Sequence, residues 1–285
     1  MKLKFGDFDD RYTDYKNSKV VILPVCFDET CTWQKGCKYG PISIIDASKQ
    51  LENYDIELGK ELYTVGIHCL NPIENITDPK TLIDEVYLVV KEQLDKDKFT
   101  IVLGGEHTVA LGSIKACIEK FSPLTVVQFD AHLDNRKEYN GSKYNHACVM
   151  YRVRELNDYV LQIGIRSADY LELTNVNEEE IIYIHELINI IKWDYYISQK
   201  IKTENIYITF DLDVFDPSIM PCVGTPEPGG LMWYETLKLL KNLFINFNVV
   251  GIDIVEFMPI NNLLHPNYLV AKLIYKIVGY KYFIV

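Results

Sequence analysis

Short apolar runs recur along the whole chain, each four to seven residues long and rich in Val, Ile, Tyr or Phe. Few polar residues interrupt them, which is typical of strands that are buried on both faces of a parallel sheet. The pattern therefore predicts strands over the following residues: Val20–Val25, Leu62–Ile67, Phe99–Leu103, Leu124–Phe129, Tyr159–Ile165, Ile181–Ile184, Ile206–Phe210 and Val249–Val255.

Stretches with helical periodicity lie between most of these runs. One begins with Asp78 and Pro79, an N-cap residue followed by proline at the first helical position. The alternation predicts an α/β fold with three αβα layers, in which helices cover both faces of a central parallel sheet of about eight strands. One domain over residues 1–285 is the simplest organisation, and the strand order does not follow from the pattern. The predicted helices are about Ile42–Glu52, Pro79–Leu94, Thr108–Lys120, Ala147–Glu155, Leu187–Lys200, Tyr234–Phe247 and Asn267–Val278.

The composition is that of a globular protein, with 48% hydrophobic and 24% charged residues. The net charge of −11 argues against nucleic acid as a partner, because an acidic chain gains nothing from phosphate counterion release. It weakly favours a small cationic substrate. No apolar run has the length of a membrane span or the character of a signal peptide, so we expect a cytoplasmic protein with no membrane partner. The seven scattered cysteines lack metal-site spacing and are expected to be free thiols.

Polar residues gather immediately after four of the predicted strands. In an open α/β sheet, the carboxyl ends of the strands are where sites are built. A histidine follows one strand in GGEH, a DAHLD segment follows the next, a DLD segment follows a third, and a glutamate follows the last. These residues are His107, Asp130, His132, Asp134, Asp211, Asp213 and Glu256.

The spacing of the acidic residues indicates a metal site. Residues at i, i+2 and i+4 of an extended segment share a face, and a row of carboxylates on one face is repulsive unless a cation lies between them. Four carboxylates and two imidazoles exceed the needs of one ion, and this donor set without thiolate suits Mn²⁺ better than structural Zn²⁺. We interpret the set as a two-metal hydrolase site that activates a shared water. The alternative is a set of helix-capping aspartates with core histidines.

The motifs GGEHTVALG, FDAHLD, and ITFDLDVFDPSIMP followed by GTPEPGGL resemble those of the ureohydrolase (arginase/agmatinase) family. The segment WQKGCKYGPISIIDAS resembles that family's substrate-cleft loop and first helix, and the similarity runs from about Val20 to Pro259. DAHLD followed by YNHACVMYRV is most like the bacterial and archaeal agmatinases. The resemblance implies an arginase-like fold, a homo-oligomer (a trimer or hexamer) and a small guanidino substrate.

The resemblance also implies two Mn²⁺ ions per subunit and a role for each ligand. His107 and Asp134 would bind one ion, His132 and Asp213 would bind the other, and two aspartates would bridge both. The bridging pair would be Asp130 and Asp211.

Further residues match catalytic and substrate positions of the family. Asp134 would also accept a hydrogen bond from the bridging hydroxide, and His146 would shuttle protons near neutral pH. Glu256 would bind the guanidinium group of the substrate, and Thr225 would lie beside that group. The implied reaction is hydrolysis of agmatine to putrescine and urea, in which the hydroxide attacks the guanidinium carbon.

Three features bear on the substrate. The stretch NRKEYNGSKYNH lacks the arginase pattern, which disfavours arginine. Arg136 would repel the amine of agmatine and welcome a carboxylate if it faced the cleft, but we favour pairing with Glu138 or a subunit contact. Cys222 stands where the family that the sequence resembles usually has a small residue, and we favour a packing role over an oxidisable thiol near the metals. The alternatives are a ureohydrolase of a guanidino acid (guanidinobutyrate, formiminoglutamate or arginine), a non-catalytic metal-binding homologue, and a mononuclear zinc deacetylase.

Overall fold

The computed structural model describes residues 3–174, 176–187, 190 and 192–284. Within them, eight strands form one parallel sheet, as the sequence predicts. From one edge to the other the strands are β4 (Ile67–Cys69), β1 (Val20–Val25), β5 (Phe99–Gly104), β10 (Asn248–Val255), β9 (Asn205–Asp211), β6 (Leu124–Phe129), β7 (Val160–Ile165) and β8 (Ile181–Tyr183).

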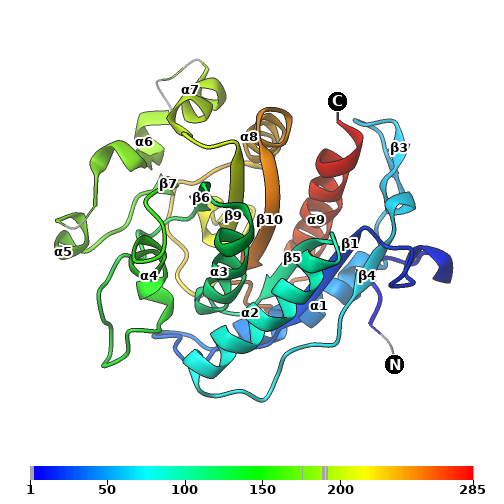
Figure 1. Cartoon of the computed structure of the whole chain (residues 1–285), viewed down its shortest axis with the longest axis horizontal. Helices are drawn as coiled ribbons and strands as arrows, with labels where there is room; N and C mark the ends of the chain where they lie inside the picture. The colour runs from blue at the N-terminus through cyan, green and yellow to red at the C-terminus, as the bar shows by residue number, and fades with distance from the viewer. Residues whose placement is uncertain (1–2, 175, 188–189, 191, 285) are drawn as a thin grey trace.

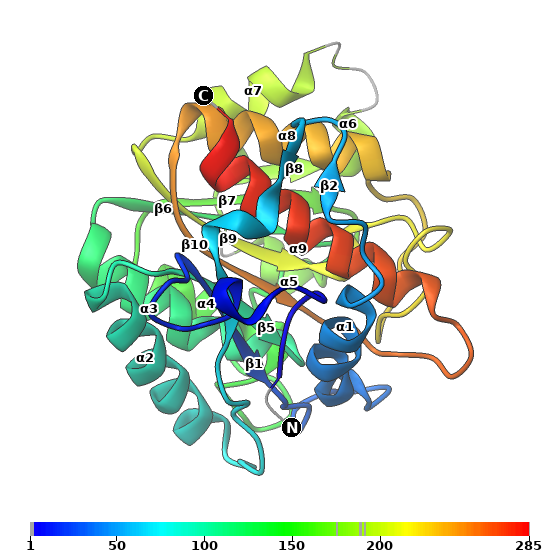
Figure 2. The same cartoon turned by 90° about the vertical axis from the view of Figure 1, so that its right-hand side faces the viewer.

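Helices cover both faces of this sheet (Figures 1 and 2). One face packs against α2 (Pro79–Asp95), α3 (Ala110–Phe121) and α4 (Val149–Arg154). The other face packs against a second set of helices, and the shorter α5 and α6 lie near the β8 edge. The remaining helices are α1 (Gly40–Ser48), α5 (Tyr170–Leu173), α6 (Ile184–Leu187), α7 (Trp193–Lys200), α8 (Trp233–Asn246) and α9 (His265–Phe283).

Alternation within the strands builds the two cores. In β5, Ile101 and Leu103 contribute to the core under α1, α8 and α9, whereas Val102 contributes to the core under α2 and α3. Successive strand residues point to opposite faces, so a strand that is covered on both sides is apolar at most positions. The apolar runs of the sequence, which few polar residues interrupt, reflect this arrangement.

The predicted start of α2 is confirmed. The Asp78 side chain accepts a hydrogen bond of 2.7 Å from the backbone N–H of Thr81, and Pro79 occupies the first turn. The cap satisfies a backbone donor that has no partner within the helix.

Two predicted elements have different bounds in the structure. Leu62–Val65 forms a 3-10 turn instead of a strand, and β4 starts only at Ile67. The reason is a distant partner, because the backbone N–H groups of Leu62 and Tyr63 donate to the hydroxyl of Tyr275 on α9. The predicted helix Leu187–Lys200 begins only at Trp193, and part of that prediction lies outside the described residues. A short hairpin of β2 (Tyr54–Asp55) and β3 (Lys60–Glu61) was not predicted.

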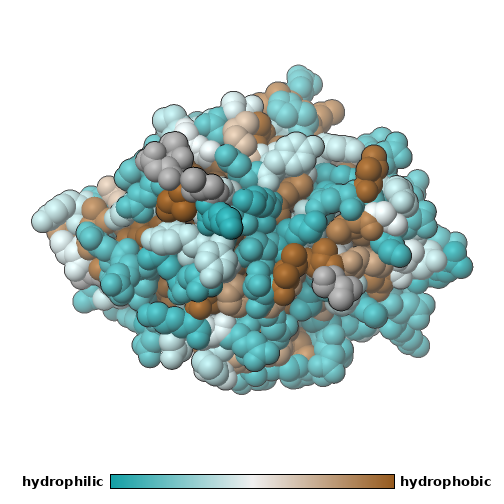
Figure 3. Space-filling model, turned by 90° about the horizontal axis from the view of Figure 1, so that it is seen from above, coloured by the Kyte–Doolittle hydropathy of each residue, from teal (hydrophilic) through white to brown (hydrophobic). Residues whose placement is uncertain are grey.

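The surface is mostly hydrophilic when the molecule is seen from above, with apolar residues in small groups (Figure 3). None of the described helices combines the length and apolar character needed to cross a membrane.

Candidate metal centre

Four adjacent strands in the middle of the sheet carry all the predicted strand-end residues. The order β5-β10-β9-β6 places His107, Glu256, the DLD segment and the DAHLD segment side by side at one edge. Because the four strands are parallel, their carboxyl ends meet there. The strand order, which does not follow from the sequence, therefore brings motifs that are far apart in the chain into one site.

His107 is the centre of a buried acidic group. Its Nδ1 lies 2.9 Å from Asp134 Oδ2, 3.3 Å from Asp130 Oδ2 and 3.5 Å from Asp211 Oδ2. The imidazole is fully buried. The ring nitrogen and three carboxylate oxygens thus converge on one small volume, as the ligands of a metal ion do.

A second group forms around His132. Its Nδ1 lies 2.8 Å from Asp213 Oδ2 and 3.7 Å from Asp130 Oδ1. Asp130 directs one oxygen to each histidine, so the two groups share it and each could hold an ion. Asp211, which the resemblance assigns to both ions, lies in the His107 group.

Backbone N–H groups hold three of the carboxylates in place. Asp130 Oδ1 accepts from the N–H of His132 at 2.6 Å, and Asp213 Oδ1 accepts from that of Ala131 at 2.9 Å. Asp211 Oδ1 accepts from the N–H of Asp213 at 2.9 Å. In Asp211 and Asp213 these bonds hold one carboxylate oxygen and orient the other, whereas Asp130 also accepts a 2.6 Å hydrogen bond from Gln128 Nε2 at Oδ2.

Sequence reasoning missed the residues behind His107. Its Nε2 lies 2.8 Å from the hydroxyl of Thr209, which donates a 2.8 Å hydrogen bond to Asp253. In this network Nε2 carries the proton, and Nδ1 is left with a lone pair that faces the aspartates. Asp253 is an acidic residue that is fully buried within an otherwise apolar strand. An aspartate inside an apolar run is unusual, and this is the sequence signal that could have identified Asp253 as a functional residue.

The electrostatics of the site favour a cation. Burial and the nearby Asp130 raise the pKa of Asp134 to about 7, and burial together with Asp213 raises the pKa of Asp211. In the described part of the chain, no lysine or arginine side chain forms an ion pair with the carboxylates of the two groups. Burial alone would raise the pKa of Asp130 as well, but hydrogen bonds from His107 and His132 lower it. The pKa of Asp213 is raised by burial and by Asp130. Three of the four buried acids therefore call for bound protons or metal ions, and the oxygen and imidazole donors fit divalent cations.

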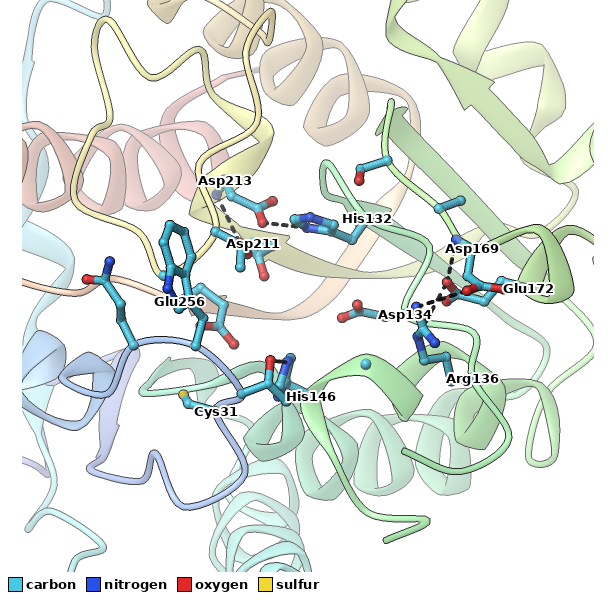
Figure 4. Close-up of a pocket in the computed structure, with 18 residues that line it drawn as sticks. Cys31, His132, Asp134, Arg136, His146, Asp169, Glu172, Asp211, Asp213 and Glu256 are labelled. Carbon is cyan, nitrogen blue, oxygen red and sulfur yellow. Dashed lines mark hydrogen bonds and ion pairs between the residues drawn. The ribbon is translucent and has the colours of Figure 1, made fainter. Parts of the chain in front are cut away.

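The two groups lie at the base of a pocket of about 300 Å³ (Figure 4). His132, Asp134, Asp211 and Asp213 line it, whereas His107 and Asp130 lie beneath its surface. The predicted residues His146, Thr225 and Glu256 also line the pocket. All nine predicted site residues are thus in or directly beneath one pocket.

Glu256 presents a half-buried carboxylate to the pocket. Its Oε1 accepts a 2.7 Å hydrogen bond from the backbone N–H of His107, and its Oε2 lies 3.3 Å from Cys37 Sγ. Burial raises its pKa to about 7. Glu256 and Asp134 both have left-handed backbone conformations, with φ of 64° and 50°. A side chain is disfavoured in that conformation, so strain is stored at two positions of the site.

His146 faces the pocket from the 3-10 turn His146–Cys148, which precedes α4. Burial lowers the pKa of its imidazole to about 4, which makes the ring neutral at physiological pH. Nε2 lies 3.4 Å from the Thr32 hydroxyl, and the buried Nδ1 has no hydrogen-bond partner. A neutral imidazole with a free nitrogen can accept a proton from a group in the pocket.

The structure corrects one prediction and confirms another. Arg136 lines the pocket and lies 3.6 Å from both Glu172 and Asp169, so the predicted pairing with Glu138 is wrong. Both partners come from the α5 region, which the sequence analysis did not predict as an element. Cys222 is fully buried in the core and does not line the pocket, which confirms its packing role.

Comparisons with known proteins agree with the site. The Arginase family profile matches residues 18–279. The chain is 38% identical to the N(1)-aminopropylagmatine ureohydrolase of Synechocystis sp., over 94% of this chain and 90% of that protein. It is 30% identical to the agmatinase of Pyrococcus horikoshii, with 93% of each covered. The solved agmatine ureohydrolase of Thermoplasma volcanium is similar with a TM-score of 0.88 and 33% identity, over 98% of this chain and 94% of that one. The chain therefore belongs to the arginase family and is a hydrolase of guanidino C–N bonds.

Proposed function

We propose that this chain hydrolyses the guanidinium group of agmatine, or of a longer amine built on agmatine, and releases urea. The observation that carries the proposal is the pair of histidine–aspartate groups that share Asp130 beneath a pocket whose wall presents Glu256. A guanidinium that pairs with Glu256 would be held beside the metal-binding groups.

The cofactor we propose is two Mn²⁺ ions. His107, Asp130, Asp134 and Asp211 would hold one ion, and Asp130, Asp211, His132 and Asp213 would hold the other. Four aspartates balance the charge of two divalent ions. The chemistry that such a pair of ions supplies is a water molecule acidified enough to be a nucleophile at neutral pH.

The chain's own side chains would bind the substrate and move its protons. The Glu256 carboxylate would accept two hydrogen bonds from the planar guanidinium and so fix the position of its carbon. Thr225, at the same pocket wall, would orient the guanidinium. Asp134 would accept the proton of the nucleophile, and His146 would pass a proton to the departing amine, because its neutral ring can both accept and donate.

The charges at the pocket mouth favour an amine tail over an acid. Arg136 contributes one positive charge there, and Asp169 and Glu172 contribute two negative charges within 3.6 Å of it. The excess of one carboxylate would attract an ammonium group and repel the carboxylate of a guanidino acid. This supports the cationic substrates over guanidinobutyrate, formiminoglutamate and arginine.

A second candidate substrate is N(1)-aminopropylagmatine. The Synechocystis sp. relative is named for it, and that compound carries an additional cationic group beyond the agmatine tail. Hydrolysis of its guanidinium would yield spermidine and urea, whereas agmatine would yield putrescine. Both products are polyamines, so we propose a role in polyamine synthesis.

The test is urea release by the Mn²⁺-loaded protein, with agmatine, N(1)-aminopropylagmatine, arginine and 4-guanidinobutyrate assayed in parallel. Urea from one or both amines, and little from the acids, is the expected result. Turnover of 4-guanidinobutyrate alone would reverse our interpretation of the pocket mouth. Two bound metal ions with no turnover of any guanidine would favour the non-catalytic homologue.

Two further proposals rest on the family resemblance. We propose that the chain forms a trimer or hexamer and acts in the cytoplasm. Light scattering during size-exclusion chromatography would measure the first, and fractionation of the source cells would measure the second.

A further inference from the structure

Two cysteines lie close to Glu256. They belong to the segment between β1 and α1, which brings Cys31 to the pocket surface (Figure 4) and leaves Cys37 fully buried. One donor atom from each of Cys31, Cys37 and Glu256 lies within 4.8 Å of the others. The mechanism proposed above uses Glu256 but neither thiol.

The spacing of these donors fits a metal ion. A tetrahedral ion with bonds of about 2.3 Å to sulfur holds its ligand atoms about 3.8 Å apart. The three donor atoms lie within 4.8 Å of one another, and Cys37 Sγ lies 3.3 Å from Glu256 Oε2, so their separations are of this order. A disulfide would instead require the two sulfurs to approach to about 2.05 Å.

The donor chemistry differs from that of the manganese-type centre. Two thiols and one carboxylate form a soft set, and thiolate ligands select zinc-like cations over Mn²⁺. Three protein ligands also leave one position of a tetrahedral ion open toward the pocket. The His107 and His132 groups, by contrast, contain oxygen and nitrogen donors alone.

The cluster lacks a competing positive side chain. In the described residues, no lysine or arginine forms an ion pair with Glu256, and the nearby Lys38 lies 3.4 Å from Asp28 instead. The hydrogen bond with Cys31, together with burial, raises the pKa of the Cys37 thiol well above its usual range. Without a cation the thiols are protonated, and binding of one divalent ion as a dithiolate would release two protons to solvent.

We propose that Cys31, Cys37 and Glu256 form a site for a thiophilic divalent cation of the Zn²⁺ or Cd²⁺ type. Occupancy of this site ties up the carboxylate that would otherwise bind the guanidinium, so the cation inhibits the enzyme without displacing the two catalytic ions. The binding half of this proposal stands independently, and the inhibition half rests on the proposed function.

The binding test uses Cd²⁺ added to the Mn²⁺-loaded protein under reducing conditions. The ultraviolet thiolate-to-cadmium charge-transfer band reports binding, and the oxygen and nitrogen donors of the manganese-type centre cannot produce it. We expect the band to saturate at one Cd²⁺ per chain and to be lost in Cys31→Ser and Cys37→Ser. Cys26→Ser is the matched control, because Cys26 is a half-buried thiol of the same segment outside the cluster, and this variant keeps the band.

Three results would overturn the site. One is an absent band in protein whose seven thiols are all free, and another is a band that persists in both Cys31→Ser and Cys37→Ser. The third is a thiol count that falls by two without cadmium and recovers on reduction, which would show a disulfide.

The inhibition test compares urea release with and without Cd²⁺ within each variant, at a constant excess of Mn²⁺. We expect Cd²⁺ to raise KM for the guanidino substrate in the wild type and in Cys26→Ser, with at least a tenfold weaker effect in Cys37→Ser. Equal inhibition of all variants would indicate displacement of Mn²⁺ and contradict the inhibition half. If no variant releases urea while the band behaves as expected, the proposed function fails and the cation site stands.

Discussion

Asp130 is the residue on which the two metal-binding groups depend together, because each of its oxygens faces one histidine. We predict that Asp130→Ala lowers urea release by at least about a thousandfold and lowers the bound metal below two ions per chain. Metal analysis after gel filtration, together with the urea assay, measures both. Asp158→Asn changes an exposed carboxylate outside the pocket and serves as the control. Full metal content in Asp130→Ala would contradict the shared-ligand arrangement.

Thr209 acts on the metal centre through His107. Thr209→Val keeps the shape of the side chain but removes the hydroxyl that lies 2.8 Å from Nε2. We predict about a 10–100-fold weaker Mn²⁺ affinity, because residues behind metal ligands typically contribute that much. Activity measured against Mn²⁺ concentration tests this, and an excess of Mn²⁺ should restore most of the rate. Unchanged affinity would show that the tautomer of His107 is fixed by another contact.

Asp169 provides a test of the pocket mouth. It is 41% exposed and lies 3.6 Å from Arg136, so it remains accessible to a substrate tail. We predict that Asp169→Asn raises KM for N(1)-aminopropylagmatine about fivefold, as expected for loss of one exposed charge contact of about 1 kcal/mol. The effect on agmatine should be smaller, because agmatine has a shorter tail. Equal effects on both substrates would show that Asp169 does not contact the additional cationic group of N(1)-aminopropylagmatine.

Sequence reasoning succeeded for the site wherever a polar residue ended an apolar run. His107, Asp130 and Asp211 stand at such points, and the sheet brings them together. Sequence reasoning failed for residues whose contacts depend on the tertiary structure. Thr209 lies inside an apolar run, and Arg136 pairs with two residues at the start of α5, more than thirty positions further along the chain.

The same distinction holds for whole elements. The Asp78–Pro79 cap is a local signal, and α2 begins where the sequence predicts. The run at Leu62 is as apolar as a strand, but its backbone donates to Tyr275, which is 213 residues further along. No pattern within the run encodes that partner. Strand order is likewise a property of the assembled sheet, since neighbouring strands such as β5 and β10 are distant in sequence.

The contact between α9 and the β2–β3 hairpin contains an ionic network that should depend on pH. Lys276 on α9 lies 2.8 Å from both Asp55 and Glu57, and Lys241 reaches Glu57 as well. Burial alone would raise the pKa of Glu57, but the hydrogen bonds from Lys241 and Lys276 lower it from 4.5 to about 2. A lowered pKa stabilises the fold above about pH 4.5, and this contribution is lost as the pH falls toward 2.

We predict that Glu57→Gln lowers the free energy of unfolding by about 1 kcal/mol at pH 7, a modest value because the side chain is 36% exposed. The difference from the wild type should shrink at pH 3, where Glu57 begins to take up a proton. Urea denaturation at the two pH values measures it. Glu61→Gln, an exposed site on the same hairpin, should show no such change. A difference that grows as the pH falls would refute the assignment.

At the scale of the whole molecule, metal ions and fold should stabilise one another. Four mutually close, buried carboxylates lie at the carboxyl ends of the neighbouring strands β9 and β6, and they repel one another when no cation is present. Removal of metal with a chelator should lower the melting temperature, and added Mn²⁺ should restore it in proportion to the logarithm of its concentration. Calorimetry measures both. A melting temperature that does not respond to the chelator would mean that the acids are protonated or that metal binds weakly.

The left-handed backbone at Asp134 and Glu256 has an evolutionary consequence. Glycine would relax the backbone at both positions and remove an acidic side chain from the site, so each carboxylate is kept at a cost to the stability of the fold. Selection for heat resistance alone, acting on a metal-free chain, would tend to erase these two side chains. A lineage can retain these two side chains only while the rest of the fold is stable enough to offset their cost. That excess stability also limits how many further destabilising substitutions its descendants can tolerate.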